Sequence, residues 1–248
     1  MKQFALAFVV LLMSIMIVSG ISLAQDGDGD TPTGTIVDVL QTLSVPQFGA
    51  EPNDLYPDIV QSRTADGGFV LGDPDAPLVV VEFADFMCPH CQEYEETMDQ
   101  FIDEFVRTGQ ARLEYRFFPI VSQVYSPLTS QVAECAGDEG MFWAARSLLF
   151  SLAQQQEVTP EISQLVADRL GLDAESLADC VTRAQQFVTD MQLGDALGVN
   201  GTPAIMVRVG ESDPQWVSVR GEVFDRGGLP YEMLALIAQS VNEQNSGG

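Results

Sequence analysis

The amino-acid sequence predicts an α/β fold built on a central sheet, with helices on both faces and a helical insertion. An unbroken apolar run at 78–83 is typical of a strand covered on both faces, and a CPHC tetrapeptide and a helical pattern follow it. Residues 127–197 are helical in pattern throughout, and two strand patterns and a last helical pattern come after them. The order β-α-β, helical block, β-β-α favours a single sheet whose two parts are separated along the chain by the insertion.

Composition and charge narrow the class of protein. The chain has 248 residues, of which 46% are hydrophobic and 19% charged, as is usual for a globular protein. With 11 Lys+Arg and 36 Asp+Glu, the formal net charge is −25. A phosphate polyanion would be repelled, so the charge argues against nucleic acid and anionic lipid as partners. Adaptation to high salt and drift in base composition both account for such acidity, and the sequence does not separate them.

The amino terminus has the pattern of a secretory signal. Residues 4–18 are almost all apolar, and small residues occupy the −3 and −1 positions before Gln25. We therefore expect residues 1–24 to be a signal peptide. An N-terminal membrane anchor is the alternative, because residues 4–24 carry no charge and are long enough to span a bilayer. Either way the rest of the chain is expected to be extracytoplasmic (periplasmic, secreted or anchored facing outside), where disulfides persist.

The remaining chain divides into three parts. Residues 25–65 are expected to form an acidic, proline-containing linker. Asp26, Asp28 and Asp30 look like the start of a calcium loop, but its positions 6 and 12 would be Thr31 and Val37, which do not fit. Residues 66–243 form the expected domain, with the helical insertion at about 124–197, and residues 244–248 form a tail.

Periodicity assigns the elements of the domain. After the CPHC motif, apolar residues at i, i+4, i+7, i+8 and i+11 mark one face of a helix that ends near Gly109; these are Tyr94, Met98, Phe101, Ile102 and Phe105. Strict alternation at 112–118 predicts a strand. In the insertion, helical patterns begin at 127, 141, 161 and 174, and the last, over 174–191, leaves a break open. Strands are expected at 204–209 and 216–220, joined by a polar turn, and a closing helix at 231–241.

The CPHC motif carries the chemistry. With Cys88 at the N-cap of the helix, Pro89 takes the first helical position, where a missing N–H costs nothing. Cys88 then faces free backbone N–H groups and the positive end of the helix dipole, which favour the thiolate that attacks disulfides. Cys91 follows three residues later on the same face, so a disulfide can close. His90, the only histidine, is expected between the two sulfurs, where it would stabilise the Cys88 thiolate further and make the disulfide a strong oxidant.

Two other interpretations of the C-x-x-C pair, a zinc site and a structural disulfide, fit the sequence less well. A zinc site would need Cys135 and Cys180 as further ligands, but these are single cysteines in helical patterns and not a second C-x-x-C. A purely structural Cys88–Cys91 disulfide would constrain little of the chain. We therefore expect a redox-active pair, with no metal and no organic cofactor.

The sequence around the motif resembles the DsbA-like thiol–disulfide oxidoreductases of the thioredoxin superfamily. The resemblance covers about residues 65–242 and implies a thioredoxin-like central sheet, with the helical insertion between the first βαβ unit and a cis-Pro strand. The matching segments are Gly72-Asp73-Pro74, the stretch from Val81 to Cys91, 114–119 (EYRFFP), Glu134-Cys135-Ala136, 140–143 (GMFW) and 198–204 (GVNGTPA).

The resemblance also implies roles for single residues. Cys88 would be the exposed nucleophile and Cys91 the buried resolving thiol. Pro203 would follow a cis bond from Thr202 and present the Thr202 backbone to an extended substrate. Glu82 corresponds to a buried carboxylate beneath the cysteines of many relatives. Alone in an apolar strand its pKa should rise, which suits a proton relay to or from Cys91; a hydrated Glu82 at the strand end is the alternative.

The two remaining cysteines are expected to pair. If Cys88 bonds Cys91 by proximity, Cys135–Cys180 is the one other disulfide that four cysteines allow. In an exported protein this bond is favoured as a structural disulfide, while two separate buried thiols are the alternative.

Together these observations predict an exported dithiol oxidase that introduces disulfides through Cys88–Cys91. Its partners would be reduced exported proteins and a membrane redox partner, implied by the resemblance, that reoxidises the pair. A reductase or isomerase with the same site, or a non-enzymatic module that binds metal or peptide, are the alternatives.

Overall fold

The computed structural model of the chain describes residues 55–210 and 212–246. The expected signal peptide or anchor (1–24) and the first part of the expected linker (25–54) therefore lie outside the described residues. Within the described part, we find no helix with the length and apolar character needed to cross a bilayer.

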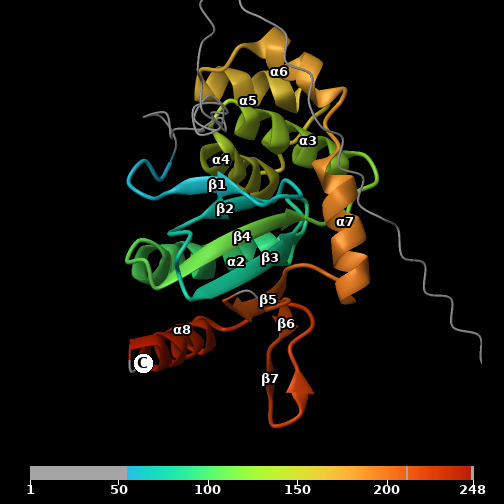
Figure 1. Ribbon diagram of the computed structural model, residues 1–248. Helices are drawn as coiled ribbons and strands as arrows, with labels where there is room; N and C mark the ends of the chain where they lie inside the picture. Colours follow the sequence, from blue (N-terminus) through green and yellow to red (C-terminus); the bar gives the residue numbers. More distant parts are fainter. Residues whose placement is uncertain (1–54, 211, 247–248) are drawn as a thin grey trace, which may run out of the picture. The chain divides into compact units, whose positions relative to one another are not determined.

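A mixed sheet of six strands forms the centre of the fold, in the order β1-β2-β4-β3-β5-β6 (Figure 1). Its middle strand, β3 (Leu78–Ala84), is buried along its whole length. It runs parallel to β4 (Ala111–Phe117) and antiparallel to β5 (Ala204–Val209). The three strands expected at 78–83, 112–118 and 204–209 are thus confirmed, and β3 is buried because strands pair with both its edges and helices cover both its faces.

The edges of the sheet differ from the expectation. Gln61–Arg63, expected in the linker, forms β1, which pairs with β2 (Phe69–Leu71). β1 is short and exposed and shows no apolar alternation, so periodicity could not find it. The strand expected at 216–220 is divided: β6 (Gln215–Trp216) pairs with β5, whereas β7 (Ser218–Val219) turns away.

β7 joins β8 (Glu222–Val223) in a separate two-stranded sheet. The two strands form a hairpin that extends away from the central sheet (Figure 1). Both strands are exposed, so burial contributes little to holding this hairpin.

Helices cover both faces of the sheet. Val79, Val81 and Phe83 point to the side covered by α7 (Gln186–Leu197), where a Cβ on Gly194 would lie 2.6 Å from the Phe118 ring. The opposite face packs against α2, the π-helical turn η1, α4 and α8. The bounds are Pro89–Phe101 for α2, Ile102–Val106 for η1 and Tyr231–Ser246 for α8. The apolar face predicted for α2 is buried as expected, but its last turn is a π-helix, and α8 runs into the expected tail.

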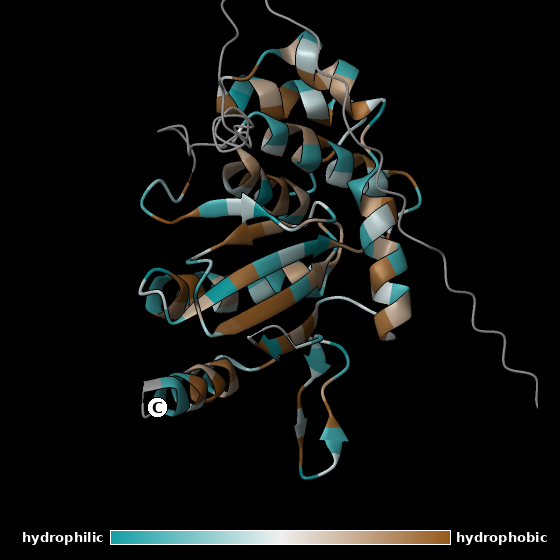
Figure 2. Ribbon diagram, viewed as in Figure 1, coloured by the Kyte–Doolittle hydropathy of each residue, from teal (hydrophilic) through white to brown (hydrophobic). Residues whose placement is uncertain are grey.

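The helical insertion follows β4 and gathers at the β1 end of the sheet (Figure 1). Its members are α3 (Tyr125–Asp138), α4 (Phe142–Gln154), α5 (Ile162–Leu170) and α6 (Ala174–Val181). The break left open within 174–191 is present, because α6 ends at Val181 and α7 begins at Gln186. Figure 2 shows the mixture of hydrophobic and hydrophilic residues along these helices, which is expected of helices with one buried side.

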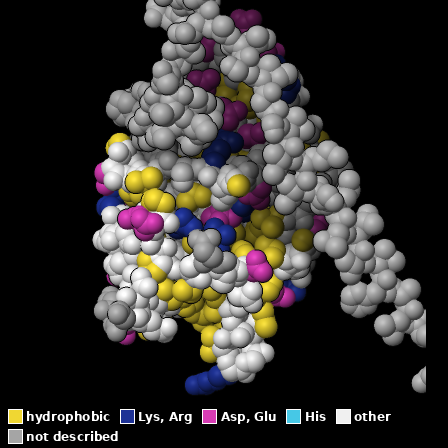
Figure 3. Space-filling view, in the orientation of Figure 1, with side chains coloured by type: hydrophobic (Ala, Val, Ile, Leu, Met, Phe, Trp, Pro, Cys, Tyr) yellow, Lys and Arg dark blue, Asp and Glu magenta, His cyan; other side chains and the backbone are white. Residues whose placement is uncertain are grey.

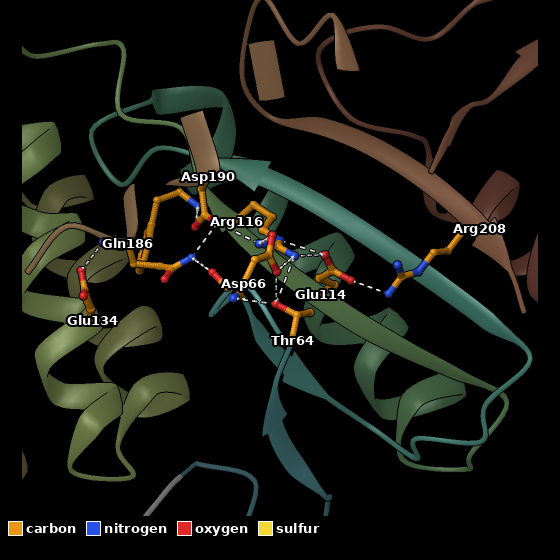
Figure 4. A network of polar contacts seen from close by, with 10 residues as sticks. Thr64, Asp66, Glu114, Arg116, Glu134, Gln186, Asp190 and Arg208 are labelled. Atoms are coloured by element: carbon orange, nitrogen blue, oxygen red, sulfur yellow. Dashed lines mark hydrogen bonds and ion pairs between the residues drawn. The ribbon is translucent and has the colours of Figure 1, made fainter. Parts of the chain in front are cut away.

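An ion cluster centred on the buried Arg116 lies on the α7 side of the sheet (Figure 4). We call it the Arg116 cluster; Arg116, Glu114 and Asp190 are buried, Arg208 is partly exposed and Asp66 is exposed. The Arg116 guanidinium donates to Glu114 at 2.8 Å, Asp190 at 2.9 Å and Asp66 at 2.9 Å. Arg208 donates to the second oxygen of Glu114 at 2.7 Å. The cluster ties β4, β5, α7 and the β1–β2 turn together. Figure 3, in the orientation of Figure 1, shows basic and acidic side chains interspersed across the middle of the molecular surface.

Candidate active site

The CPHC motif lies at the carboxyl end of β3, where the chain turns into α2. Cys88 is the N-cap residue of α2 and Pro89 stands in its first turn, as the sequence predicts. Both cysteines are free thiols in this structure, so it shows the reduced pair. Cys88, which was expected to be exposed, is buried in this structure at 5% exposure because it packs against Thr202, and Cys91 is fully buried, so Cys88 is the sulfur nearer to solvent.

Hydrogen bonds lower the pKa of the Cys88 thiol from 9.0 to about 5. The largest contribution is a hydrogen bond from the Cys91 thiol, against which burial acts. Thr202 and the backbone N–H groups of Cys91 and His90 lower the pKa further. Cys91 behaves in the opposite way, because burial raises the pKa of its thiol well above the usual range. One sulfur of the pair is therefore an anion at neutral pH and the other stays protonated.

His90 does not lie where the sequence analysis placed it. Its side chain is 77% exposed, and Nδ1 is 3.7 Å from Glu93 Oε2 rather than between the two sulfurs. His90 stands in the first turn of α2. Its backbone N–H donates to the Cys88 sulfur, whereas its ring points to solvent.

The Thr202–Pro203 loop faces the motif from the start of β5. The bond between Thr202 and Pro203 is cis, and in its thiol form Cys88 Sγ donates a hydrogen bond to the Thr202 carbonyl oxygen at 3.3 Å. The Thr202 hydroxyl is buried and has no hydrogen-bond partner among the described residues. It is thus a donor held ready for a thiolate, which accepts hydrogen bonds and cannot donate one.

Asp85 holds the loop that leads from β3 to Cys88. Its buried carboxylate accepts the backbone N–H groups of Met87 (2.9 Å), Ile120 (2.8 Å) and Val121 (2.7 Å). Its carbonyl accepts the N–H of Cys88 at 3.0 Å. Asp85 therefore joins the loop before the motif to the loop after β4.

Glu82 lies on the face of β3 that carries α2 and α4, but it is not alone. Arg146 of α4 donates to Glu82 Oε2 at 3.0 Å and to both oxygens of Glu95 of α2, at 2.6 and 2.8 Å. We call these three residues the Arg146 cluster. Arg146 and Glu82 are buried, and Glu95 is 16% exposed.

The Arg146 cluster holds two carboxylates against one arginine. Burial raises the pKa of Glu82, and Arg146 opposes the rise. Burial raises the pKa of Glu95 to about 8, again against Arg146 and with a further rise from Glu82. Glu82 Oε1 and Arg146 Nε have no hydrogen-bond partner among the described residues. The cluster can therefore hold a proton near neutral pH, which a fully paired cluster would not.

Sequence reasoning missed Arg146, Glu95 and Tyr115. Tyr115 is the register partner of Glu82 on β4, lies under the Arg146 guanidinium (5.1 Å to the ring centre) and is influenced by the charges of Glu82 and Cys91. A signal was available for Arg146, because it is the one charged residue in the mostly apolar run 141–150 and a buried arginine needs an acidic partner.

Cys135 of α3 and Cys180 of α6 form a disulfide with an Sγ–Sγ distance of 1.99 Å. The bond lies in the insertion and joins two helices that are separated in the sequence by α4 and α5. Among the described residues, we find no group of three or more His, Cys, Asp or Glu side chains placed to hold a metal ion.

A strand–CPHC–helix unit that faces a cis-proline loop defines a thioredoxin-fold protein with a dithiol site. A family model described as thioredoxin matches residues 64–214, so the chain belongs to the thioredoxin family.

Among solved structures, Wolbachia pipientis alpha-DsbA1 superimposes with a TM-score of 0.61 at 16% identity, covering 73% of this chain and 94% of that one. Oxidised BdbD from Bacillus subtilis gives a TM-score of 0.58 at 22% identity, covering 74% and 98%. At these identities the likeness shows the fold. The predicted resemblance to DsbA-like proteins and the thioredoxin-like sheet with a helical insertion are confirmed.

Two curated relatives are similar in sequence. The Na(+)/H(+) antiporter NhaA 1 of Salinispora arenicola is 34% identical over 155 residues, which is 60% of this chain and 23% of the antiporter. Disulfide bond formation protein D of Bacillus subtilis is 29% identical over 152 residues, 56% of this chain and 66% of that protein. The chain thus spans only about a quarter of the antiporter and two thirds of the disulfide protein.

Proposed function

We propose that this protein is an exported thiol–disulfide oxidoreductase that works as a dithiol oxidase through Cys88 and Cys91. The observation that carries the proposal is the low pKa of Cys88, about 5, beside a Cys91 thiol whose pKa is raised. A stabilised thiolate stabilises the reduced pair, and a pair that is stable when reduced is oxidising as a disulfide.

The reaction balances two electrons. A substrate thiolate attacks Cys88 Sγ of the Cys88–Cys91 disulfide, the bond between the two cysteines breaks, and Cys91 leaves as a thiolate that takes up a proton. A second substrate thiolate then attacks the substrate sulfur of the mixed disulfide, and Cys88 leaves as its stabilised thiolate. The substrate gains a disulfide and the pair is reduced.

Glu82 is the residue that we propose for the proton of Cys91. Burial raises its pKa, one of its oxygens has no partner among the described residues, and Tyr115 next to it is influenced by the charges of both Glu82 and Cys91. The acid form would protonate the Cys91 thiolate as it leaves, and the carboxylate would take the proton back when the pair is reoxidised. Replacing Glu82 by Gln is expected to slow formation of the mixed disulfide without moving the pKa of Cys88.

The substrates are reduced exported proteins, and a membrane redox partner that passes electrons to a quinone would reoxidise the pair. Thr202 and Pro203 would pair with the extended substrate, because they present backbone groups next to Cys88. The Cys135–Cys180 disulfide would have a structural role and persists only outside a reducing compartment, which supports an extracytoplasmic location.

The decisive test is oxidative refolding of a reduced model protein. The oxidised protein should speed the return of that protein's activity, and the Cys88→Ser variant should not. The reduction potential separates the alternatives, since a value near about −120 mV marks an oxidase and one near about −270 mV a reductase. A protein that leaves refolding unaffected and binds copper or zinc stoichiometrically would instead be the non-enzymatic module.

A further inference from the structure

The Tyr94 hydroxyl makes an uncommon double contact. It donates to the carbonyl oxygen of Leu229 at 2.8 Å and accepts the N–H of the same residue at 3.0 Å. Tyr94 lies on α2, three residues after Cys91, and both Tyr94 and Leu229 are buried. One side chain therefore satisfies both backbone groups of a loop residue that are shielded from water, as a neighbouring strand would.

Gly228, the residue before Leu229, is hydrogen-bonded to the cis-proline loop. The N–H of Gly228 donates to the Pro203 carbonyl oxygen at 3.2 Å. Gly228 has a φ of +77°, and a Cβ at this position would lie 2.4 Å from the Tyr94 ring. Only glycine fits between the Tyr94 ring and the loop, so the segment 227–229 is wedged between α2 and Pro203.

These hydrogen bonds link Tyr94 of α2, through the segment 227–229 and the cis-proline loop, to Cys88 at the start of the same helix. The Thr202 carbonyl oxygen, next to Pro203, lies 3.3 Å from Cys88 Sγ and accepts its hydrogen bond when Cys88 is a thiol, and Cys88 is the N-cap of the helix that carries Tyr94. Apart from the Cys88 thiol, the Tyr94 hydroxyl is the single side-chain group among these hydrogen bonds.

We propose that Tyr94 is a positioning residue that holds the Thr202–Pro203 backbone at the right distance from Cys88 for an extended polypeptide to pair with it. The proposal rests on the proposed function. Tyr94 touches no reacting atom. Without its hydroxyl, the N–H and carbonyl of Leu229 would be buried without partners, and the segment would shift to find others. The Gly228–Pro203 hydrogen bond would then loosen, and the cis-proline loop with it.

This role separates two kinds of substrate. A polypeptide needs both Cys88 and the backbone of the cis-proline loop, whereas a small dithiol such as dithiothreitol needs only the sulfur. Loss of the Tyr94 hydroxyl should therefore weaken the reaction with polypeptides and leave the reaction with dithiothreitol unchanged.

The test compares Tyr94→Phe with Tyr231→Phe. Tyr231 is a matched control, because it follows the same segment in the sequence but its hydroxyl contacts the carboxylate of Glu104 and not the backbone of Leu229. For Tyr94→Phe we expect the KM for a peptide with two cysteines to rise about tenfold, with kcat and the rate with dithiothreitol unchanged. Hydrogen exchange of the Gly228 and Leu229 amides should also become faster. Tyr231→Phe should change none of these.

A second variant approaches the same segment from its other side. Gly228→Ala places a methyl group against the Tyr94 ring and is expected to raise the peptide KM in the same way. The proposal is overturned if Tyr94→Phe leaves both the peptide KM and the Gly228 exchange rate as in the wild type, or if the rate with dithiothreitol falls in parallel. If the wild type oxidises no peptide at all, the proposed function fails, and the exchange rates alone still decide whether Tyr94 holds the loop.

Discussion

Two ion clusters, each centred on a buried arginine, lie on opposite faces of the same sheet and differ in how their carboxylates are hydrogen-bonded. In the Arg116 cluster two arginines meet three carboxylates, and every carboxylate oxygen accepts at least one hydrogen bond. In the Arg146 cluster one arginine meets two carboxylates, and Glu82 Oε1 has no partner among the described residues. Burial raises the pKa of Asp190 in the first cluster, as it does for Glu82 and Glu95 in the second. The difference therefore lies in hydrogen-bond satisfaction and in position, since only the Arg146 cluster lies on the α2 side of the sheet.

The comparison teaches that buried charge serves two purposes here. A saturated cluster has no spare acceptor and acts as a cross-link between β4, β5, α7 and the β1–β2 turn. The Arg146 cluster, on the α2 side of the sheet, has a carboxylate oxygen without a partner among the described residues and keeps the capacity to exchange a proton. Two predictions test this distinction, and two further ones test the source of the Cys88 thiolate's stability.

The largest effect is expected from Arg116→Leu. This change leaves Glu114, Asp66 and Asp190 without their shared cation, so the free energy of unfolding should fall by about 3–5 kcal/mol, toward the upper end. Urea unfolding of the oxidised protein measures the loss. The pKa of Cys88, followed by thiolate absorbance, should stay near 5; if it moves by more than a unit, the two clusters are not independent.

Arg146→Met should have the next largest effect, lowering the free energy of unfolding by about 3 kcal/mol near pH 8. This loss of stability should become smaller as the pH falls. Without Arg146 the pKa values of Glu82 and Glu95 rise further, so at lower pH both carboxyls are neutral and their burial costs less. Unfolding measured from pH 5 to 8 tests the trend. Arg183→Met, which removes an exposed i,i+4 pair with Asp179, is the control and should cost almost nothing. A loss from Arg146→Met that does not vary with pH would contradict the idea that this cluster titrates.

The reduced and oxidised forms should differ in stability in a pH-dependent way. Because the pKa of Cys88 is lowered from 9.0 to about 5, the reduced form gains stability as the pH rises from 5 to 9, whereas a disulfide does not titrate. At pH 7 the gain is about 3 kcal/mol, or about 60 mV in the potential. The carboxyl groups titrate in both forms, so their effects largely cancel in the difference. Parallel unfolding of both forms at several pH values gives the slope, and a flat difference would be inconsistent with a stabilised thiolate.

The smallest effect is expected from His90→Gln. The ring is exposed beside Glu93, while the backbone N–H of residue 90 is kept in the variant. The pKa of Cys88 should therefore rise by less than about one unit. Titration of the thiolate measures it, and a rise of two units or more would restore the ring to the role first predicted for it.

Much of the architecture could be predicted because it depends on local pattern. The apolar run at 78–83, the alternation at 112–118 and the helical face of α2 each indicate their element, and the structure has all three. The strands that were missed are β1, β2 and β8, which have two or three residues and are too short for a period to show, and the one strand expected at 216–220 is divided into β6 and β7.

The active site divides in the same way. The sequence alone determined that Cys88 and Cys91 lie close together, because they stand three residues apart at the start of one helix. The partners of Glu82 and the contact of Tyr94 with Leu229 were decided by the tertiary structure, since they join residues 64 and 135 positions apart. No local pattern encodes such contacts: a buried polar group takes whichever partner the packed helices bring within hydrogen-bond distance, and the direction of the His90 ring was likewise set by the space left around the first turn of α2.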